Sequence, residues 1–219
     1  MPPLSSTARV CSAASISPVP RGERRRREIA AVAEQVFFEN GFTDTTMQTI
    51  AARAGASKET LYRHFGSKEG LFAEIVETRA RTFLGGLDGS EDWPGSVGEV
   101  LRETGLLIME GLFGQSAISL CRIVVAESPR SPELGRIFLE EGPYRIRRHL
   151  TVFLDAARRR GELSCEDPGR AATIFLGALI AAVHIERLVL QPPPVLTREQ
   201  AVPHVDEAVA MFLARYAKS

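Results

Sequence analysis

The chain has 219 residues, of which 44% are hydrophobic and 25% are charged, an ordinary composition for a soluble globular protein with one large domain or two small ones. Its longest apolar stretch, residues 171–183, is shorter than the roughly 20 residues that a membrane-spanning helix needs, so we predict no membrane contact. The formal net charge of zero indicates no partner, but residues 1–68 hold ten basic and six acidic side chains. This small excess favours an N-terminal surface that meets an anion.

The cysteines and the N-terminus set further limits. Cys11, Cys121 and Cys165 are few and far apart, without the spacing of a metal site, as is typical of a reduced protein. Residues 1–20 are rich in Ser, Ala and Pro and contain no continuous apolar run, so we expect a disordered tail rather than a secretory signal. We therefore predict a cytoplasmic protein that needs no metal and no cofactor.

Helical periodicity predicts an N-terminal domain over residues 21–84, called the head below. Apolar residues at three- and four-residue spacing, together with glycine stops, predict helices at about residues 22–40, 46–53, 57–64 and 68–84. Thr45 and Gln48 have the spacing of a capping box for the second helix, and Ser57 is placed to cap the third. Gly55 lies between these two short helices, where a sharp turn needs a left-handed residue. The arrangement is that of a helix-turn-helix.

Residues 85–219, called the body below, also favour helices. The glycine-rich stretch 85–98 predicts a linker, and further helices are expected near residues 97–113, 117–127, 131–160, 168–190 and 198–217. Pro143 should kink or split the third of these helices. Because no alternation of period two stands out, the sequence predicts an all-α fold.

The third helix of the head has a polar, partly cationic outward face. Its outward residues are Ser57, Lys58, Thr60, Tyr62, Arg63 and His64. Such a helix can lie in the major groove of DNA and reach base edges and phosphates. Any exposed polar helix face looks similar, but the preceding Gly55 and the following Ser67-Lys68 favour DNA recognition here.

Between Gly41 and Phe72 the sequence combines Gly41-Phe42, Thr45-Thr46, Ile50-Ala51, Ala54-Gly55, Leu61-Tyr62, His64-Phe65 and Lys68-Glu69. With this combination, about residues 22–72 resemble the N-terminal domain of the TetR family of bacterial regulators. The resemblance implies a homodimer that binds a palindromic operator on double-stranded DNA. In most members it also implies a repressor that a small-molecule effector in the C-terminal domain releases from DNA.

The resemblance also implies roles for individual head residues. Matches to places where the family often touches the DNA backbone are Thr46, Thr60, Tyr62, His64 and Lys68. Gln48 and Lys58 match places where base edges are often read. Lys68 would add positive charge to a helix N-terminus that points at phosphate. The basic run Arg24–Arg27 either grips a flanking phosphate, enters the minor groove as a basic arm, or forms a solvated, flexible segment.

For the body, the resemblance implies dimerisation and effector binding. Helices over about 170–190 and 200–216 would pack against the partner subunit, which we favour over a role only in the core of one subunit because a palindrome needs two heads. Residues 126–135 and 160–163 are similar to regulators of the multidrug type. Candidate cavity residues are Met109, Phe113, Cys121, Val125, Phe153, Phe175 and His184, although each could be ordinary core packing.

Two other classes of function stay open from the residues. A helical protein-interaction module could keep this fold after losing DNA binding. An all-helical enzyme could assemble a site from distant residues, but GxSxG, GxGxxG, P-loop and HExxH motifs are absent from the sequence. The adjacent carboxylates Glu140 and Glu141 point in different directions on a helix. We therefore predict a regulator and not an enzyme.

Overall fold

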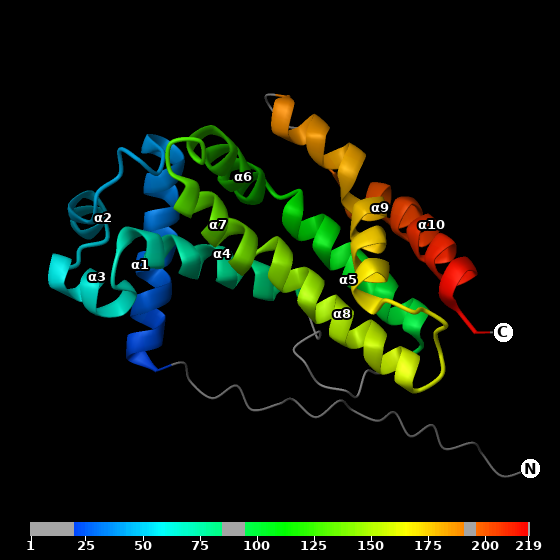
Figure 1. Cartoon of the computed structure of the whole chain (residues 1–219). Helices are drawn as coiled ribbons and strands as arrows, with labels where there is room; N and C mark the ends of the chain where they lie inside the picture. The colour runs from blue at the N-terminus through cyan, green and yellow to red at the C-terminus, as the bar shows by residue number, and fades with distance from the viewer. Residues whose placement is uncertain (1–19, 85–94, 191–195, 219) are drawn as a thin grey trace, which may run out of the picture.

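The computed structural model describes residues 20–84, 95–190 and 196–218 and is helical throughout, apart from an isolated bridge between Leu163 and Ala217. Its helices are α1 (Arg21–Asn40), α2 (Met47–Arg53), α3 (Lys58–Phe65), α4 (Lys68–Leu84), α5 (Val97–Leu112), α6 (Gln115–Glu127), α7 (Pro132–Glu141), α8 (Pro143–Arg159), α9 (Pro168–Val189) and α10 (Arg198–Tyr216). The all-α prediction is confirmed (Figure 1). The predicted tail lies almost wholly outside the described residues.

Two details of the helix boundaries are informative. Pro143 does split the predicted 131–160 helix, because α7 ends at Glu141 and Pro143 opens α8. The predicted capping box at Thr45 was wrong by one residue. Thr46 caps α2 by accepting from the backbone N–H of Thr49, whereas the buried Thr45 hydroxyl donates to the carbonyl of Gly41 at 2.6 Å.

Two hydrophobic cores hold the helices together. The first joins the head helices through residues such as Ile29 and Phe72, and it includes Leu120 of α6 and Leu134 of α7. The second fills the space among α5, α8, α9 and α10. The head therefore shares its hydrophobic core with α6 and α7 of the body, and the division at residues 84 and 85 stays a proposal.

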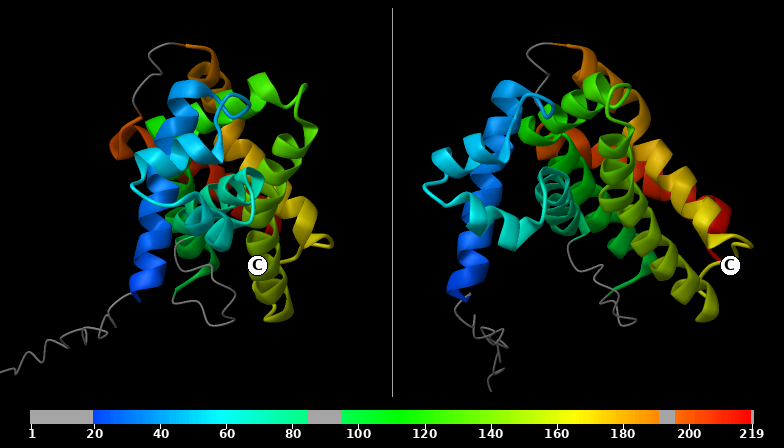
Figure 2. Two further views of the ribbon diagram at one scale, coloured as in Figure 1. Left: turned by 90° about the vertical axis from the view of Figure 1, so that its left-hand side faces the viewer. Right: turned by 60° about the vertical axis from the view of Figure 1, so that its left-hand side comes forward.

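The head and the last two helices lie at opposite ends of the molecule. α2 and α3 form one end, α9 and α10 lie at the other, and α4 runs from the head toward the body (Figures 1 and 2). Within the described ranges, no single helix has the length and hydrophobicity of a membrane span, although α5 and α6, bent by 67°, together pass that test.

Candidate nucleic-acid interface and cavity

The helix-turn-helix is built from two short helices that need fixed ends. Ser57 caps α3 by accepting from the N–H of Thr60 at 3.1 Å, as Thr46 caps α2. Gly55 has a φ of +56°, and open space surrounds the position of a Cβ, so conformation alone requires glycine here. Side-chain capping compensates for helices too short to be stable alone.

The turn between α2 and α3 is also held from outside. Arg25 of α1 donates to the carbonyls of Ala54 and Gly55 at 2.9 and 2.8 Å. These carbonyls follow the last turn of α2, where orphan acceptors need partners. The sequence predicts a phosphate grip, a minor-groove arm or a solvated segment for the run Arg24–Arg27, whereas Arg25 bonds to the turn that precedes α3.

The outward face of α3 is exposed as the sequence predicts. Leu61 and Phe65 are buried, whereas Ser57, Lys58, Tyr62 and Arg63 are exposed and Thr60 and His64 are partly buried. Thr46 and Gln48 of the α2 segment are exposed as well. Most arginines elsewhere form ion pairs, but neither Lys58 nor Arg63 has a carboxylate partner among the described residues. Cations without intramolecular partners remain available to phosphates and base edges.

Lys68 differs from these cations because its ammonium is turned inward. Its Nζ donates to the carbonyls of Phe42, Thr43 and Thr45 at 2.7, 3.2 and 2.8 Å and lies 4.4 Å from the centre of the Phe42 ring. Burial lowers the pKa of Lys68 below its ordinary value, although the negative charge of Glu69 acts to raise that pKa. An ammonium has three N–H donors. All three donors of Lys68, which the resemblance assigns to a phosphate contact, therefore have acceptors within the head.

The segment 41–45 is held from its other side by Glu127, the last residue of α6. One carboxylate oxygen accepts from the N–H of Phe42, and the other accepts from the N–H and the hydroxyl of Thr43, each at 2.6 Å. Gly41 has φ +76° and ψ 173°, and a Cβ there would lie 2.5 Å from Glu127 Oε1. No local pattern in the sequence predicts this contact, because 84 residues separate Glu127 from Thr43.

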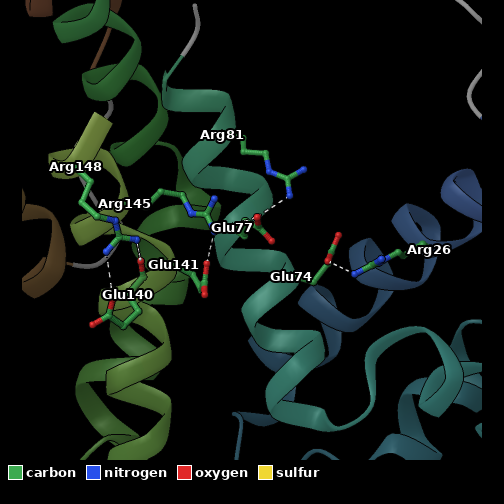
Figure 3. Close-up of polar contacts among 8 residues, drawn as sticks. All are labelled: Arg26, Glu74, Glu77, Arg81, Glu140, Glu141, Arg145 and Arg148. Atoms are coloured by element: carbon green, nitrogen blue, oxygen red, sulfur yellow. Dashed lines mark hydrogen bonds and ion pairs between the residues drawn. The ribbon is translucent and has the colours of Figure 1, made fainter. Parts of the chain in front are cut away.

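A series of ion pairs links the head to the body (Figure 3). Arg26 of α1 pairs with Glu74 of α4 at 2.6 Å, and Glu77 of α4 pairs with Arg81 and, at 3.1 Å, with Arg145 of α8. Burial alone would raise the pKa of Glu77, but the Arg81 hydrogen bond and the Arg145 charge together lower it below its ordinary value. α4 is thus tied to helices on both of its sides.

A cavity of about 440 Å³ lies among α4, α5, α6, α7, α8 and α9. Two of the seven predicted cavity residues, Cys121 and His184, line it. The other five do not, which corrects the prediction: Met109, Phe113, Phe153 and Phe175 are buried outside its lining, and Val125 is 66% exposed. Val125 lies outside the lining because α6 lines the cavity only as far as Cys121, which is one turn before Val125. Among the described residues, no cluster of His, Cys, Asp or Glu could hold a metal.

Comparisons with known proteins agree with this architecture. The profile of bacterial regulatory proteins of the tetR family matches residues 29–75, and that of the AefR-like transcriptional repressor C-terminal domain matches residues 99–218. A TetR-family regulator from Mesorhizobium loti is 28% identical, covering 91% of this chain and 100% of its own with a TM-score of 0.76. The flavonoid-responsive regulator FrrA is 32% identical, covering 89% of this chain and 97% of its own with a TM-score of 0.69.

A curated relative gives the same result. The transcriptional regulator UidR of Escherichia coli K12 is 27% identical over 143 residues, which are 64% of this chain and 69% of UidR. Regulators of this kind bind DNA and function as dimers. The C-terminal profile alone covers more than half of the 219 residues, and the helix-turn-helix has the exposed face that DNA binding needs. The chain therefore belongs to the TetR family of helix-turn-helix transcriptional regulators.

Proposed function

We propose that this regulator is a homodimeric repressor in the cytoplasm that binds a palindromic operator and leaves it when a small molecule enters the cavity. The observation that carries the DNA part is the exposed face of α3 with its two cations, Lys58 and Arg63, that lack carboxylate partners in the described ranges. Repression is supported by the match to the repressor C-terminal domain.

We assign base reading to Gln48, Lys58 and Arg63, and phosphate contacts to the hydroxyl-bearing residues. Thr46 and Ser57 use their oxygens as cap acceptors, but each hydroxyl hydrogen can still be donated to a phosphate oxygen. Thr60 lies about one turn beyond the Ser57 cap of α3, Tyr62 follows two residues later, and His64 lies in the last turn of the helix. The helix N-termini add partial positive charge toward the same phosphates.

The dimer is supported by an unpartnered apolar stripe on α9. Ile174, Ile185 and Val189 are 52%, 64% and 73% exposed, and the small residues Gly177 and Ala181 lie between them at helical spacing. Met211 of α10 is exposed as well. Isolated exposed hydrophobics are ordinary, but a continuous stripe marks an interface. A second copy on α9 and α10 would supply the second head that a palindrome requires.

The cavity favours binding over catalysis. Its lining includes one thiol, Cys121, and burial raises the pKa of that thiol to about 11, so it stays protonated and a poor nucleophile near neutral pH. A volume of about 440 Å³ suits a small organic molecule. The similar regulator FrrA is described as flavonoid-responsive, which supports a small-molecule effector here.

Selection from a randomised DNA pool at two salt concentrations tests the proposal. A dimeric reader should enrich a palindrome, with half-sites spaced about one helical turn apart, and should lose affinity steeply as salt rises. Binding without an enriched sequence would contradict operator recognition. No binding at either salt would instead favour an interaction module, which a search for protein partners would then address.

A further inference from the structure

The cavity wall is apolar over most of its area. Aliphatic and aromatic side chains from the six helices α4 to α9 form it, among them Val76, Leu112, Leu120, Phe138, Ile146 and Ile180. Val76, Leu120 and Ile146 are buried, and the other three are partly buried. An occupant must therefore have an apolar body that replaces water against this wall.

One polar atom in the wall lacks a partner. Nδ1 of His184 is buried and has no hydrogen-bond partner among the described residues, while the His184 ring lies 6.1 Å from the ring of Phe113. Burial lowers the pKa of His184, so the imidazole is neutral near pH 7. A buried polar atom without a partner costs free energy, which a ligand hydroxyl or carboxylate could recover by bonding to it.

The charged groups of the lining are all positive. Arg79 lines the cavity and is paired with Glu34 at 2.5 Å, so its charge is partly neutralised. Arg147 lies with its guanidinium 4.9 Å from the centre of the Tyr144 ring and has no carboxylate partner in the described part of the chain. None of the residues found around the cavity is Asp or Glu.

We propose that the cavity binds an apolar molecule that carries one hydroxyl or carboxylate group, and that it discriminates against organic cations. His184 Nδ1 provides the polar contact within the wall, and Arg147 provides the charge that favours an anion. This inference rests on the proposed function, because it names the chemical class of the effector. A cation would meet Arg147 and find no carboxylate in the lining to offset its desolvation.

Three probes with the same ten-carbon chain test the charge preference. Decanoate, decanol and decyltrimethylammonium are titrated calorimetrically, below their micelle concentrations, into the full-length protein. We expect decanoate and decanol to bind and decyltrimethylammonium to bind about tenfold more weakly or not at all. Equal or tighter binding of the cation, or no binding of any probe, would overturn the inference, and neither outcome depends on a variant.

Variants then test the two polar contacts that we assign to Arg147 and His184. Arg147→Glu should remove the preference for decanoate over decyltrimethylammonium, whereas Arg130→Glu, an equal charge change on an exposed residue outside the cavity lining, should keep it. His184→Leu should weaken the binding of decanol by about tenfold, because one hydrogen bond to the ligand is lost. His184→Asn, which keeps a polar group, should weaken it less. A preference that survives Arg147→Glu would refute the role of Arg147.

Operator binding measured with the same probes separates the two proposals. If decanoate binds with the expected preference but does not release DNA, the proposed ligand class is supported and the proposed ligand-induced release from the operator is contradicted. If cations release DNA and bind in the cavity as tightly as decanoate does, the proposed effector-controlled regulation is supported and the proposed ligand class is contradicted.

Discussion

The outward face of α3 and the segment 41–45 are neighbours in the head, yet they use similar side chains in opposite ways. Lys58 is exposed and its ammonium lies 5.8 Å from the centre of the Tyr62 ring, whereas Lys68 is bonded to three carbonyls of the segment 41–45. The family pattern assigns both lysines to DNA. The comparison teaches that a cation in a recognition motif can shape the surface instead of touching the ligand.

The segment 41–45 is the tighter of the two regions, and Gly41 is its most constrained residue. Its φ and ψ lie in a region that only glycine occupies readily, and Glu127 fills the space where a Cβ would be. We expect Gly41→Ala to lower the free energy of unfolding by about 3 kcal/mol in urea denaturation.

Gly22→Ala is the matched control for this prediction. Gly22 is an exposed helical residue with open space around its Cβ position, so alanine there should be neutral or slightly stabilising. Combining Gly41→Ala with Glu127→Ala should cost less than the sum of the two changes, because the clash is then absent. Strict additivity would argue against contact between Gly41 and Glu127.

Lys68→Ala and Lys58→Ala compare the contributions of the two lysines to stability. It leaves three carbonyls without their ammonium donor, so we expect a loss of about 2 kcal/mol in unfolding free energy, while Lys58→Ala should stay within about 0.5 kcal/mol. Operator binding should also weaken, because the segment 41–45 precedes the Thr46 cap.

The salt dependence of DNA binding distinguishes the two possible roles of Lys68. A lost phosphate contact reduces the slope of affinity against salt by about one, whereas a misplaced helix lowers affinity without that change. We expect the slope to persist in Lys68→Ala. A slope reduced by about one, in a variant as stable as the wild type, would restore Lys68 to the phosphate contacts.

Lys58→Ala should affect recognition and leave stability unchanged. We expect relaxed preference at one base pair per half-site, with a loss of discrimination of about 1–2 kcal/mol, in a selection from randomised operators. Arg130→Ala removes a comparable exposed charge from the body and should leave the preference intact. An unchanged preference in Lys58→Ala would place base reading on other residues of the head.

The difference between the regions also explains what the sequence could predict. Local signals decide the helices of the head: apolar spacing, Gly55 and the Ser57 cap predicted α1 to α4 to within about a residue. The exposed face of α3 followed from the same local pattern. The bonds of Lys68 and Glu127 depend on how α4 and α6 pack against the segment 41–45, and no local pattern encodes that packing.

The cavity shows the same limit. Cys121 and His184 were predicted as cavity residues because they are mildly polar groups on apolar helices, and both line it. Phe153 and Phe175 have the same apolar character but fill the second core. Apolar periodicity predicts which face of a helix is buried, whereas the gap left between buried faces depends on how the six helices α4 to α9 meet.

The smallest expected effect concerns Arg81, whose exposed ion pair with Glu77 joins two residues of the same helix. Exposed pairs of this kind contribute little, so Arg81→Ala should change the unfolding free energy by less than about 0.5 kcal/mol at pH 7. Arg145 is less exposed and pairs with both Glu77 and Glu141, so Arg145→Ala should cost more.

The pH dependence of stability gives the Arg81 prediction a sharper form. The folded-state pKa of Glu77 lies below its ordinary value of 4.5, so its ion pairs contribute stability above about pH 4.5 that is lost as the pH falls through the folded-state pKa. Arg81→Ala should shrink this acid-dependent loss slightly, and Arg145→Ala should shrink it as well. If Arg81→Ala instead removes most of the acid dependence, the exposed partner on α4 outweighs the contact between α4 and α8, and the head is tied to the body less firmly than the ion pairs of Figure 3 indicate.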